Sequence, residues 1–379
     1  MDHYAYLPLE RVVFGKPAAQ AVAEEVARIG ARRVFVVASQ SLARRTPVVR
    51  ELRRVLGAHD AGLFDECIAH TPWPSVIAAA EAVRKADPDL ILTVGGGTPI
   101  DTVKILQLVL AHGARAPEDL ERLRVPELKQ ARPSPVRQVA LPTTLSGAEF
   151  SNLGGGTDPR TRIKHSFMGA DIGARSVILD PAITLHTPAW LWLSTGIRGI
   201  DHAVEALCSV DAHPYCDGLA LHALRLFAEA LPQTQAAPKD LAARLRCQQA
   251  SWLAASTIAR VNYGASHGIG HALGAAADVP HGHTSCIMLP HVLRYNEPAT
   301  AAKQVLIAEA LGHPGKPAAD AVADLVRALG QPATLREAGV KREQLSAVAA
   351  ASMTSRWVLS NPQPIRSEAD VMRLLEAAW

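Results

Sequence analysis

Several features that would assign a chain to a common class of protein are scarce in this sequence of 379 residues. Its five cysteines are scattered and form no Cys-x-x-Cys pair, so reduced thiols are expected rather than a disulfide framework. No apolar run reaches the roughly 20 residues of a membrane span. The net charge of +3 is small, and no block of like charges is long enough to bind nucleic acid. With no signal pattern at the N-terminus, a cytoplasmic globular protein without a membrane or nucleic-acid partner is expected.

The first half of the chain alternates short apolar runs with amphipathic segments. Apolar runs at 33–38, 61–65, 90–94, 139–141 and 176–179 predict buried strands. Helical patterns lie between them, for example at 17–29, 48–56 and 75–85. This alternation, with continuously apolar strands, predicts a parallel α/β sheet of the nucleotide-binding type.

Beyond Asp180 the strand patterns stop, and helical patterns rich in alanine and leucine follow. They cover 188–209, 217–231, 239–260, 267–277, 300–311, 318–329 and 341–352. We therefore expect an α/β domain over residues 1–181 and an all-α domain over residues 182–379. The cleft between two such domains is the expected place for an active site.

A glycine-rich loop follows the strand at 90–94. Gly95, Gly96 and Gly97 allow a sharp turn and close approach of a ligand to the backbone. Thr98 can cap the next helix, and Pro99 suits its first position. The N–H groups and dipole of that helix N-terminus would suit a pyrophosphate. A plain strand–helix turn would look similar, and the loop matches neither G-x-G-x-x-G nor a P-loop.

Two other strand ends carry hydroxyl groups. Thr143 and Thr144 could bond a ribose or a nicotinamide amide, although such residues are also common in ordinary turns. Ser39 follows an early strand, where NAD-preferring domains place an acid for the ribose 2′-hydroxyl. Because Ser39 brings no negative charge, and Arg44 or Arg45 lies close by in the sequence, NADPH is expected to be accepted.

The spacing of the histidines indicates a second site. His267 and His271 are four residues apart, as are Arg198 and His202, so each pair shares one face of a helix. A short loop could return His281 to the same place. Converging imidazoles indicate a metal site, a proton-handling site, or both.

Taken together and in this order, these segments resemble the iron-containing alcohol dehydrogenase family, whose broader relatives are glycerol dehydrogenase and dehydroquinate synthase. The resemblance spans nearly the whole chain. The matching segments are Val12-Val-Phe-Gly15, Gly95 to Lys104, Pro142-Thr-Thr, Leu179-Asp-Pro181, His202-Ala-Val-Glu205, His267 to His271, and Pro280-His281-Gly282. The family fold is a Rossmann-like domain followed by an all-helical domain. The resemblance implies hydride transfer between NAD(P)H and a carbonyl or alcohol group, in a homodimeric enzyme.

The resemblance also implies roles for individual residues. Lys164 matches a family position near the cofactor, and His271 is expected beside the nicotinamide, where it assists proton transfer. The expected cofactor-binding residues are Ser39, Gly95, Gly96, Gly97, Thr98, Asp101, Thr143, Thr144 and Lys164. A divalent ion, iron or zinc, is held in the family by one aspartate and three histidines. The matching histidines here are His202, His267 and His281, which with Arg198 and His271 form the expected catalytic set.

One departure from the family pattern concerns the metal. The family's aspartate ligand, one helical turn before His202, is replaced here by Arg198, which is always charged and accepts no hydrogen bond. Arg198 and the histidines could supply positive charge without a metal, and bind a substrate carboxylate or stabilise an alkoxide. Alternatively, Arg198 turns away and three histidines with water bind the ion. In a third arrangement, Asp201 replaces the lost ligand, although an ideal helix rotates it by about 100° from His202.

A second departure concerns the branch of the family. The segment from Pro142 to Glu149 is one residue shorter than in typical alcohol dehydrogenases, and this feature resembles maleylacetate reductases, which also lack the aspartate. The glycine loop keeps the alcohol dehydrogenase form. The sequence therefore predicts NAD(P)H-dependent reduction of a small carbonyl compound, an oxo acid of the maleylacetate type. The alternative is a metal-dependent primary alcohol dehydrogenase or aldehyde reductase.

Overall fold

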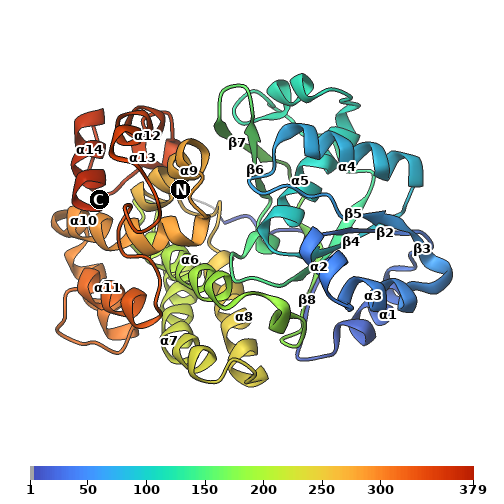
Figure 1. Cartoon of the computed structure of the whole chain (residues 1–379), viewed down its shortest axis with the longest axis horizontal. Coiled ribbons are helices and arrows are strands. Elements are labelled where there is room, and N and C mark those ends of the chain that lie inside the picture. Colours follow the sequence, from blue (N-terminus) through green and yellow to red (C-terminus); the bar gives the residue numbers. More distant parts are fainter. Residues whose placement is uncertain (1–3) are drawn as a thin grey trace. The chain divides into compact units, whose positions relative to one another are not determined.

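The computed structural model describes residues 4–379, which form two compact units. The first unit contains residues 5–187, and the second, helical unit contains residues 188–379 together with Tyr4. Figure 1 shows the sheet of the first unit and the helices of the second. The short helix η4 (Ile183–His186) still belongs to the first unit, because Ile183 is buried in a core beside the sheet.

The first unit is built on a six-stranded sheet with the order β1-β8-β5-β4-β2-β3. Its strands are β1 (Arg11–Phe14), β2 (Val34–Ala38), β3 (Asp60–Phe64), β4 (Leu90–Gly95), β5 (Arg137–Pro142) and β8 (Ala174–Leu179). Neighbouring strands are parallel throughout. β2 and β4 are buried along their whole length, which explains why their sequences are continuously apolar.

Helices cover both faces of this sheet (Figure 1). They are α1 (Ala18–Ile29), α2 (Gln40–Arg45), α3 (Val48–Leu56), α4 (Trp73–Ala86) and α5 (Gly97–His112), with the short η1 (Gly57–His59), η2 (Pro117–Leu123) and η3 (Ala148–Phe150). Alternate residues of β2 enter opposite cores: Phe35 packs with α4 and α5, and Val36 packs with α1 and α3. An antiparallel hairpin, β6 (Leu153–Asp158) and β7 (Ile163–Met168), contacts α5.

The second unit contains helices and no strand among its described residues. They are α6 (Ala189–Cys208), α7 (Pro214–Ala236), α8 (Leu241–Ala255), α9 (Ala265–Ala277), α10 (His281–Ala310), α11 (Ala318–Ala328), η5 (Arg342–Gln344), α12 (Leu345–Ser352), α13 (Arg356–Leu359) and α14 (Glu368–Ala377). α6 is buried from Trp192 to Cys208 and packs against α7, α8 and α10. The predicted fold class, a parallel α/β unit followed by an all-α unit, is confirmed.

Two local predictions were inaccurate. The helix predicted at 300–311 is the second half of α10, which bends at Thr300, where the backbone leaves helical geometry two residues after Pro298. Thr98 does not cap α5. That helix begins at Gly97, and Gly96 in an extended conformation is its N-cap, so Thr98 already lies within the first turn.

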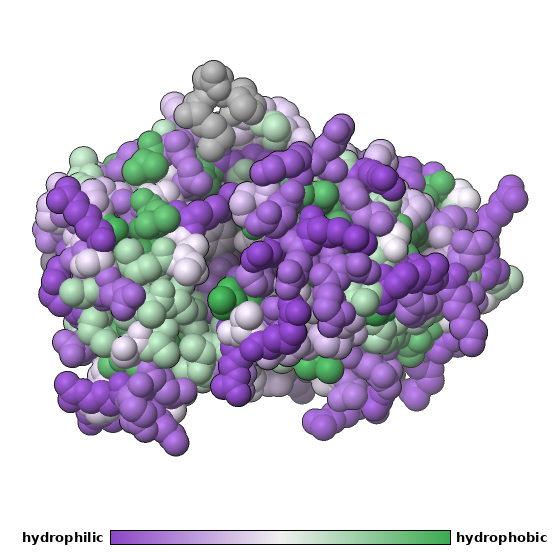
Figure 2. Space-filling model, turned by 90° about the horizontal axis from the view of Figure 1, so that it is seen from above, coloured by the Kyte–Doolittle hydropathy of each residue, from purple (hydrophilic) through white to green (hydrophobic). Residues whose placement is uncertain are grey.

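On the face drawn in Figure 2, strongly hydrophobic residues form small separate groups among hydrophilic side chains. Within residues 4–379, none of the helices combines the length and the apolar character that crossing a bilayer requires.

The packing of α6 against α7 provides a test of this fold. A Cβ atom on Gly196 of α6 would meet the Leu231 side chain of α7, whereas one on Gly218, an exposed position of α7, would meet no atom within 4 Å. Gly196→Ala is therefore expected to destabilise the protein by about 1–3 kcal/mol through overpacking. The control, Gly218→Ala, should stabilise it by about 0.5–1 kcal/mol through helix propensity. Denaturant unfolding measures both, and equal stability of the two variants would contradict the described packing.

Candidate active site

The glycine loop lies at the carboxyl ends of β4, β2 and β5. The N–H of Thr143 donates to the carbonyl of Gly95 at 3.0 Å, which joins the two loops. A Cβ atom on Gly95 would lie 3.2 Å from Ser39 Oγ, and one on Gly96 would lie 3.1 Å from Thr144 Oγ1. Gly95 also has a φ of +146°, which side-chain-bearing residues rarely adopt. Glycine is therefore required by both space and backbone conformation.

The start of α5 brings further residues to this loop. Asp101 Oδ2 accepts a hydrogen bond from the backbone N–H of Gly155 on β6 at 3.1 Å. The side chain of Lys164 on β7 lies across Gly155, against the position a Cβ would occupy. A Cβ on Gly97 would lie 3.2 Å from Ser146 Oγ, a hydroxyl that the sequence analysis did not single out. The residues expected to bind the cofactor therefore meet at one edge of the first unit, next to the N-terminus of α5.

Two charged side chains are buried beside this loop. Lys104 on α5 is fully buried and donates from Nζ to Ser151 Oγ at 3.1 Å, to Leu153 O at 2.8 Å and to Ala148 O. Burial lowers the pKa of Lys104, although Asp101 opposes the change. Glu149 is also buried, and among the described residues its Oε2 has no hydrogen-bond partner. Burial raises the pKa of Glu149 to about 7.

This burial predicts a pH-dependent effect of Glu149 on stability. The pKa of Glu149 is about 7 in the folded state, against an ordinary value of 4.5. As pH rises from 4.5 to about 7, the carboxyl group of Glu149 loses its proton in the unfolded chain but keeps it in the folded protein. Glu149 therefore lowers the free energy of unfolding increasingly over this range, and the loss stays constant above it. Glu149→Gln should match the wild type at pH 4.5 and exceed its stability at pH 8 by about 3 kcal/mol. Unfolding curves at both pH values measure this, and a pH-independent difference would contradict it.

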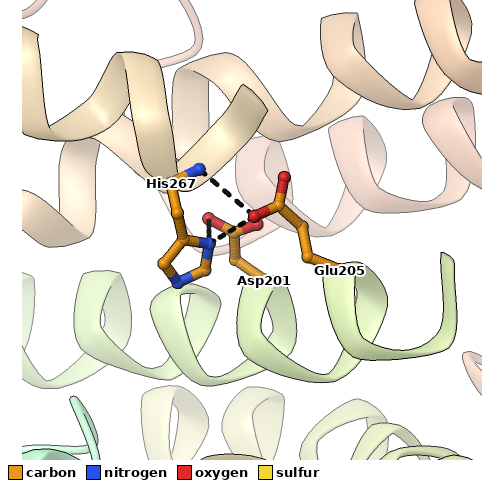
Figure 3. A group of neighbouring side chains, drawn as sticks. All are labelled: Asp201, Glu205 and His267. Carbon is orange, nitrogen blue, oxygen red and sulfur yellow. Dashed lines mark hydrogen bonds and ion pairs between the residues drawn. The ribbon is translucent and has the colours of Figure 1, made fainter. Parts of the chain in front are cut away.

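The histidines of α6 and α9 form a buried chain. His267 Nε2 lies 2.8 Å from His202 Nδ1, and His267 Nδ1 lies 2.7 Å from Glu205 Oε2. Glu205 also accepts hydrogen bonds from the backbone N–H groups of Ser266 and His267. Figure 3 shows the His267 ring directed toward two carboxylates of α6, those of Glu205 and Asp201. His267 is thus hydrogen-bonded on both ring nitrogens.

Arg198 belongs to the same cluster. Its Nη1 donates to Ser285 Oγ on α10 at 3.1 Å and lies 3.8 Å from Asp201 Oδ2. Asp201 Oδ2 accepts hydrogen bonds from Ser285 Oγ at 2.6 Å and Ser266 Oγ at 2.9 Å. Burial alone would raise the pKa of Asp201, but the neighbouring His267 ring and the Arg198 guanidinium hold it below its usual value.

His271 and His281 form a separate pair. Their ring centres lie 5.8 Å apart, and both side chains are half-buried. Trp357 of α13 contacts His271 at 4.8 Å and His267 at 5.7 Å between ring centres. The structure thus gathers the five expected catalytic residues as two neighbouring groups, linked through α9 and Trp357.

The sequence analysis gave no role to Glu205, Ser266 or Ser285. The involvement of Glu205 could have been predicted, because it lies four residues after Asp201 and residues four apart lie on one face of a helix. No comparable signal exists for Ser266 and Ser285, which reach Asp201 only through the packing of α9 and α10 against α6.

Comparisons with known proteins identify the family of this chain. A family model described as iron-containing alcohol dehydrogenase matches residues 9–181, and its C-terminal counterpart matches residues 192–379. The chain belongs to the iron-containing alcohol dehydrogenase family. It is 31% identical to a maleylacetate reductase of Pseudomonas sp. (strain P51), over 97% of this chain and 95% of the relative.

Solved structures show the same relationship. The crystal structure of maleylacetate reductase from Rhizobium sp. strain MTP-10005 superposes with a TM-score of 0.82 at 28% identity, covering 100% of this chain and 99% of the other. A 1,3-propanediol oxidoreductase superposes with a TM-score of 0.89 at 28% identity, covering 100% of both chains. The protein is thus an NAD(P)-dependent oxidoreductase acting on CH–OH or C=O groups.

The family uses iron, so we tested whether the residues present fit a divalent ion. Among residues 4–379, the group whose possible ligand atoms lie within 4.8 Å of one another is Asp201, Glu205 and His267. His202, His267 and His281 are not assembled as a comparable group.

The distances and charges in this cluster do not fit such an ion. Two ligands of a tetrahedral ion lie about 3.3 Å apart, whereas His267 is 2.7 Å from Glu205 Oε2 and 2.8 Å from His202 Nδ1. These are hydrogen-bond distances, with a proton between the atoms. Asp201 Oδ1 has no partner among the described residues, but it offers one ligand where an ion needs about four. The Arg198 guanidinium already supplies positive charge beside Asp201.

Proposed function

We propose that this enzyme reduces a small oxo acid with NAD(P)H, and that Arg198 binds the carboxylate of the substrate. The observation that carries the proposal is that the buried guanidinium of Arg198 uses only one of its three nitrogens among the described residues. Arg198 is buried, and all of its hydrogen bonds and ion pairs within residues 4–379 are made by Nη1. The remaining N–H donors match the bidentate geometry of a carboxylate. Asp201 and Ser285 are its partners on the Nη1 side, and a substrate carboxylate would satisfy the donors that they do not reach.

The proposed roles divide between the two units. When bound, NAD(P)H supplies the hydride for the carbonyl carbon. The loops around Gly95 and Thr143 in the first unit bind and orient the dinucleotide. In the helical unit, Ser285 and Asp201 fix Arg198 so that the carboxylate is held in one orientation. His271 is proposed to donate the proton that the carbonyl oxygen takes up. His267 is hydrogen-bonded to both Glu205 and His202, and the two histidines are proposed to support the site around Arg198.

The similarity to maleylacetate reductases over almost the whole chain supports an oxo acid of this type as the substrate. A metal-dependent primary alcohol dehydrogenase is the second candidate. The structural similarity to 1,3-propanediol oxidoreductase supports it, whereas the spacing of His267 and Glu205 does not. We also propose a cytoplasmic homodimer; the five free cysteines support a reducing compartment.

Replacing Arg198 tests the carboxylate site. Arg198→Ala should raise KM for maleylacetate more than tenfold, about 1.4 kcal/mol, and change kcat/KM for a neutral aldehyde much less. Arg198→Lys keeps the charge but loses the fork of donors, so an intermediate KM is expected. If loss of the charge beside Asp201 prevents Arg198→Ala from folding, Arg198→Lys alone still tests the proposal. An unchanged KM for maleylacetate in both variants would refute the proposal.

The metal requirement separates the two candidates. Enzyme dialysed against a chelator should keep its activity, and metal analysis should find far less than one iron or zinc per chain. Arg198→Asp adds a third carboxylate beside Asp201 and Glu205, and it should bind zinc measurably in calorimetry. One tightly bound ion per wild-type chain, with activity lost on its removal, would instead support the alcohol dehydrogenase.

A further inference from the structure

The edge of the sheet that carries the glycine loop continues across two more strands. β2 pairs with β4 on one side and with β3 on the other, so that Val37 lies beside both Thr93 and Phe64. The N–H of Ser39 donates to the carbonyl of Val94 at 3.1 Å. Asp65 is the first residue after β3. The ends of the three strands therefore coincide, and Ser39 lies between the glycine loop and Asp65.

This arrangement determines where the adenosine half of a dinucleotide would lie. With the pyrophosphate at the N-terminus of α5, the adenosine ribose extends over the end of the neighbouring strand. β4 has two neighbours in the sheet, β2 and β5. β5 carries Thr143 and Thr144, which are expected to contact the nicotinamide half, so the adenosine ribose is assigned to β2. The 2′-position of the ribose then faces Ser39 and the residues beside it. This step rests on the cofactor part of the proposed function.

A charged pair lies at that position. Arg44 on α2 donates from Nε to Asp65 Oδ2 at 2.8 Å and from Nη2 to Asp65 Oδ1 at 3.2 Å. Glu66 Oε1 is 3.6 Å from Arg44 Nη2. The hydrogen bond from Arg44 lowers the pKa of Asp65. Half of the Arg44 side chain is exposed, so a ligand can reach the guanidinium without unfolding the helix.

We propose that Arg44 and Asp65 together set the preference between NADPH and NADH. Arg44 binds the 2′-phosphate of NADPH with bidentate, charge-assisted hydrogen bonds. Asp65 competes for the same donors and, with Glu66, repels the phosphate. An exposed ion pair contributes little to stability, so the phosphate can displace Asp65. With NADH bound, the Arg44–Asp65 pair stays closed. Both dinucleotides are therefore accepted, and the two side chains act in opposite directions on the choice.

Dissociation constants measured by fluorescence titration test this without any substrate. Arg44→Ala should weaken NADPH binding about tenfold or more and change NADH binding less than about twofold. Asp65→Asn frees the guanidinium and removes a repelling charge, so NADPH binding should tighten several-fold while NADH binding is again little changed. The ratio of the two constants should thus move in opposite directions in the two variants.

The chain offers a matched control at the other end of β3. Arg53 Nε donates to Asp60 Oδ2 at 2.8 Å, in a pair of similar exposure but far from the glycine loop along the strand. Arg53→Ala should leave both constants unchanged. Equal effects of Arg44→Ala on both dinucleotides, or no effect, would overturn the proposal while leaving the proposed reaction intact. Wild-type protein that binds neither dinucleotide would overturn both. Failure to reduce an oxo acid, with the opposite shifts observed, would overturn only the proposed substrate.

Discussion

The carboxylate of Asp201 joins three helices of the second unit at one point. It lies on α6, and its Oδ2 accepts hydrogen bonds from Ser266 of α9 and Ser285 of α10. The same oxygen lies 3.4 Å from His267 Nδ1 and 3.8 Å from Arg198 Nη1. Because the carboxylate is fully buried, its charge must be balanced by these neighbours. The positions of Arg198 and His267 therefore both depend on Asp201.

The pairing of Arg198 with Asp201 reverses the sign of the charge that the family resemblance implies at the Arg198 position. At the position where the family resemblance implies an anionic metal ligand, this chain has Arg198, which lies beside a carboxylate one helical turn away on α6. The positive charge thus belongs to the protein and is present at every working pH, since a guanidinium keeps its proton. In the proposed function this fixed charge takes the place of a metal ion, and it accepts fewer geometries than an exchangeable ion does. A planar carboxylate is the group that the fork of guanidinium donors matches best.

Much of the fold could be predicted because buried parallel strands have continuous apolar sequences, as in β2 and β4. The hairpin of β6 and β7 could not, because Gly154, Gly155 and Gly156 leave no alternating pattern in β6. The contribution of residues 114–135 to the core could not be predicted either. Its charges and prolines indicate a surface loop, yet Leu120 and Leu123 of η2 are fully buried in the core beside α4 and α5.

Part of the candidate site could also be predicted from the sequence, and part could not. The convergence of Ser39, Gly95 and Thr143 follows from topology, since the carboxyl ends of parallel strands share an edge. The partners of His267 depend on ring rotation and on how α9 crosses α6, which helical spacing does not contain. Asp201 shows what helical spacing alone cannot predict. Its position on α6 is turned away from that of His202, but both residues contact His267, because α9 packs over the side of α6 between them.

Lys104 has a consequence for the kinetics of nucleotide binding. Its ammonium group ties α5 to the backbone and hydroxyl oxygens of residues 148–153, directly beside the glycine loop. A loop anchored in this way is already ordered before a ligand arrives, and little conformational entropy is lost on association. Dinucleotide binding should then proceed without a slow loop-folding phase.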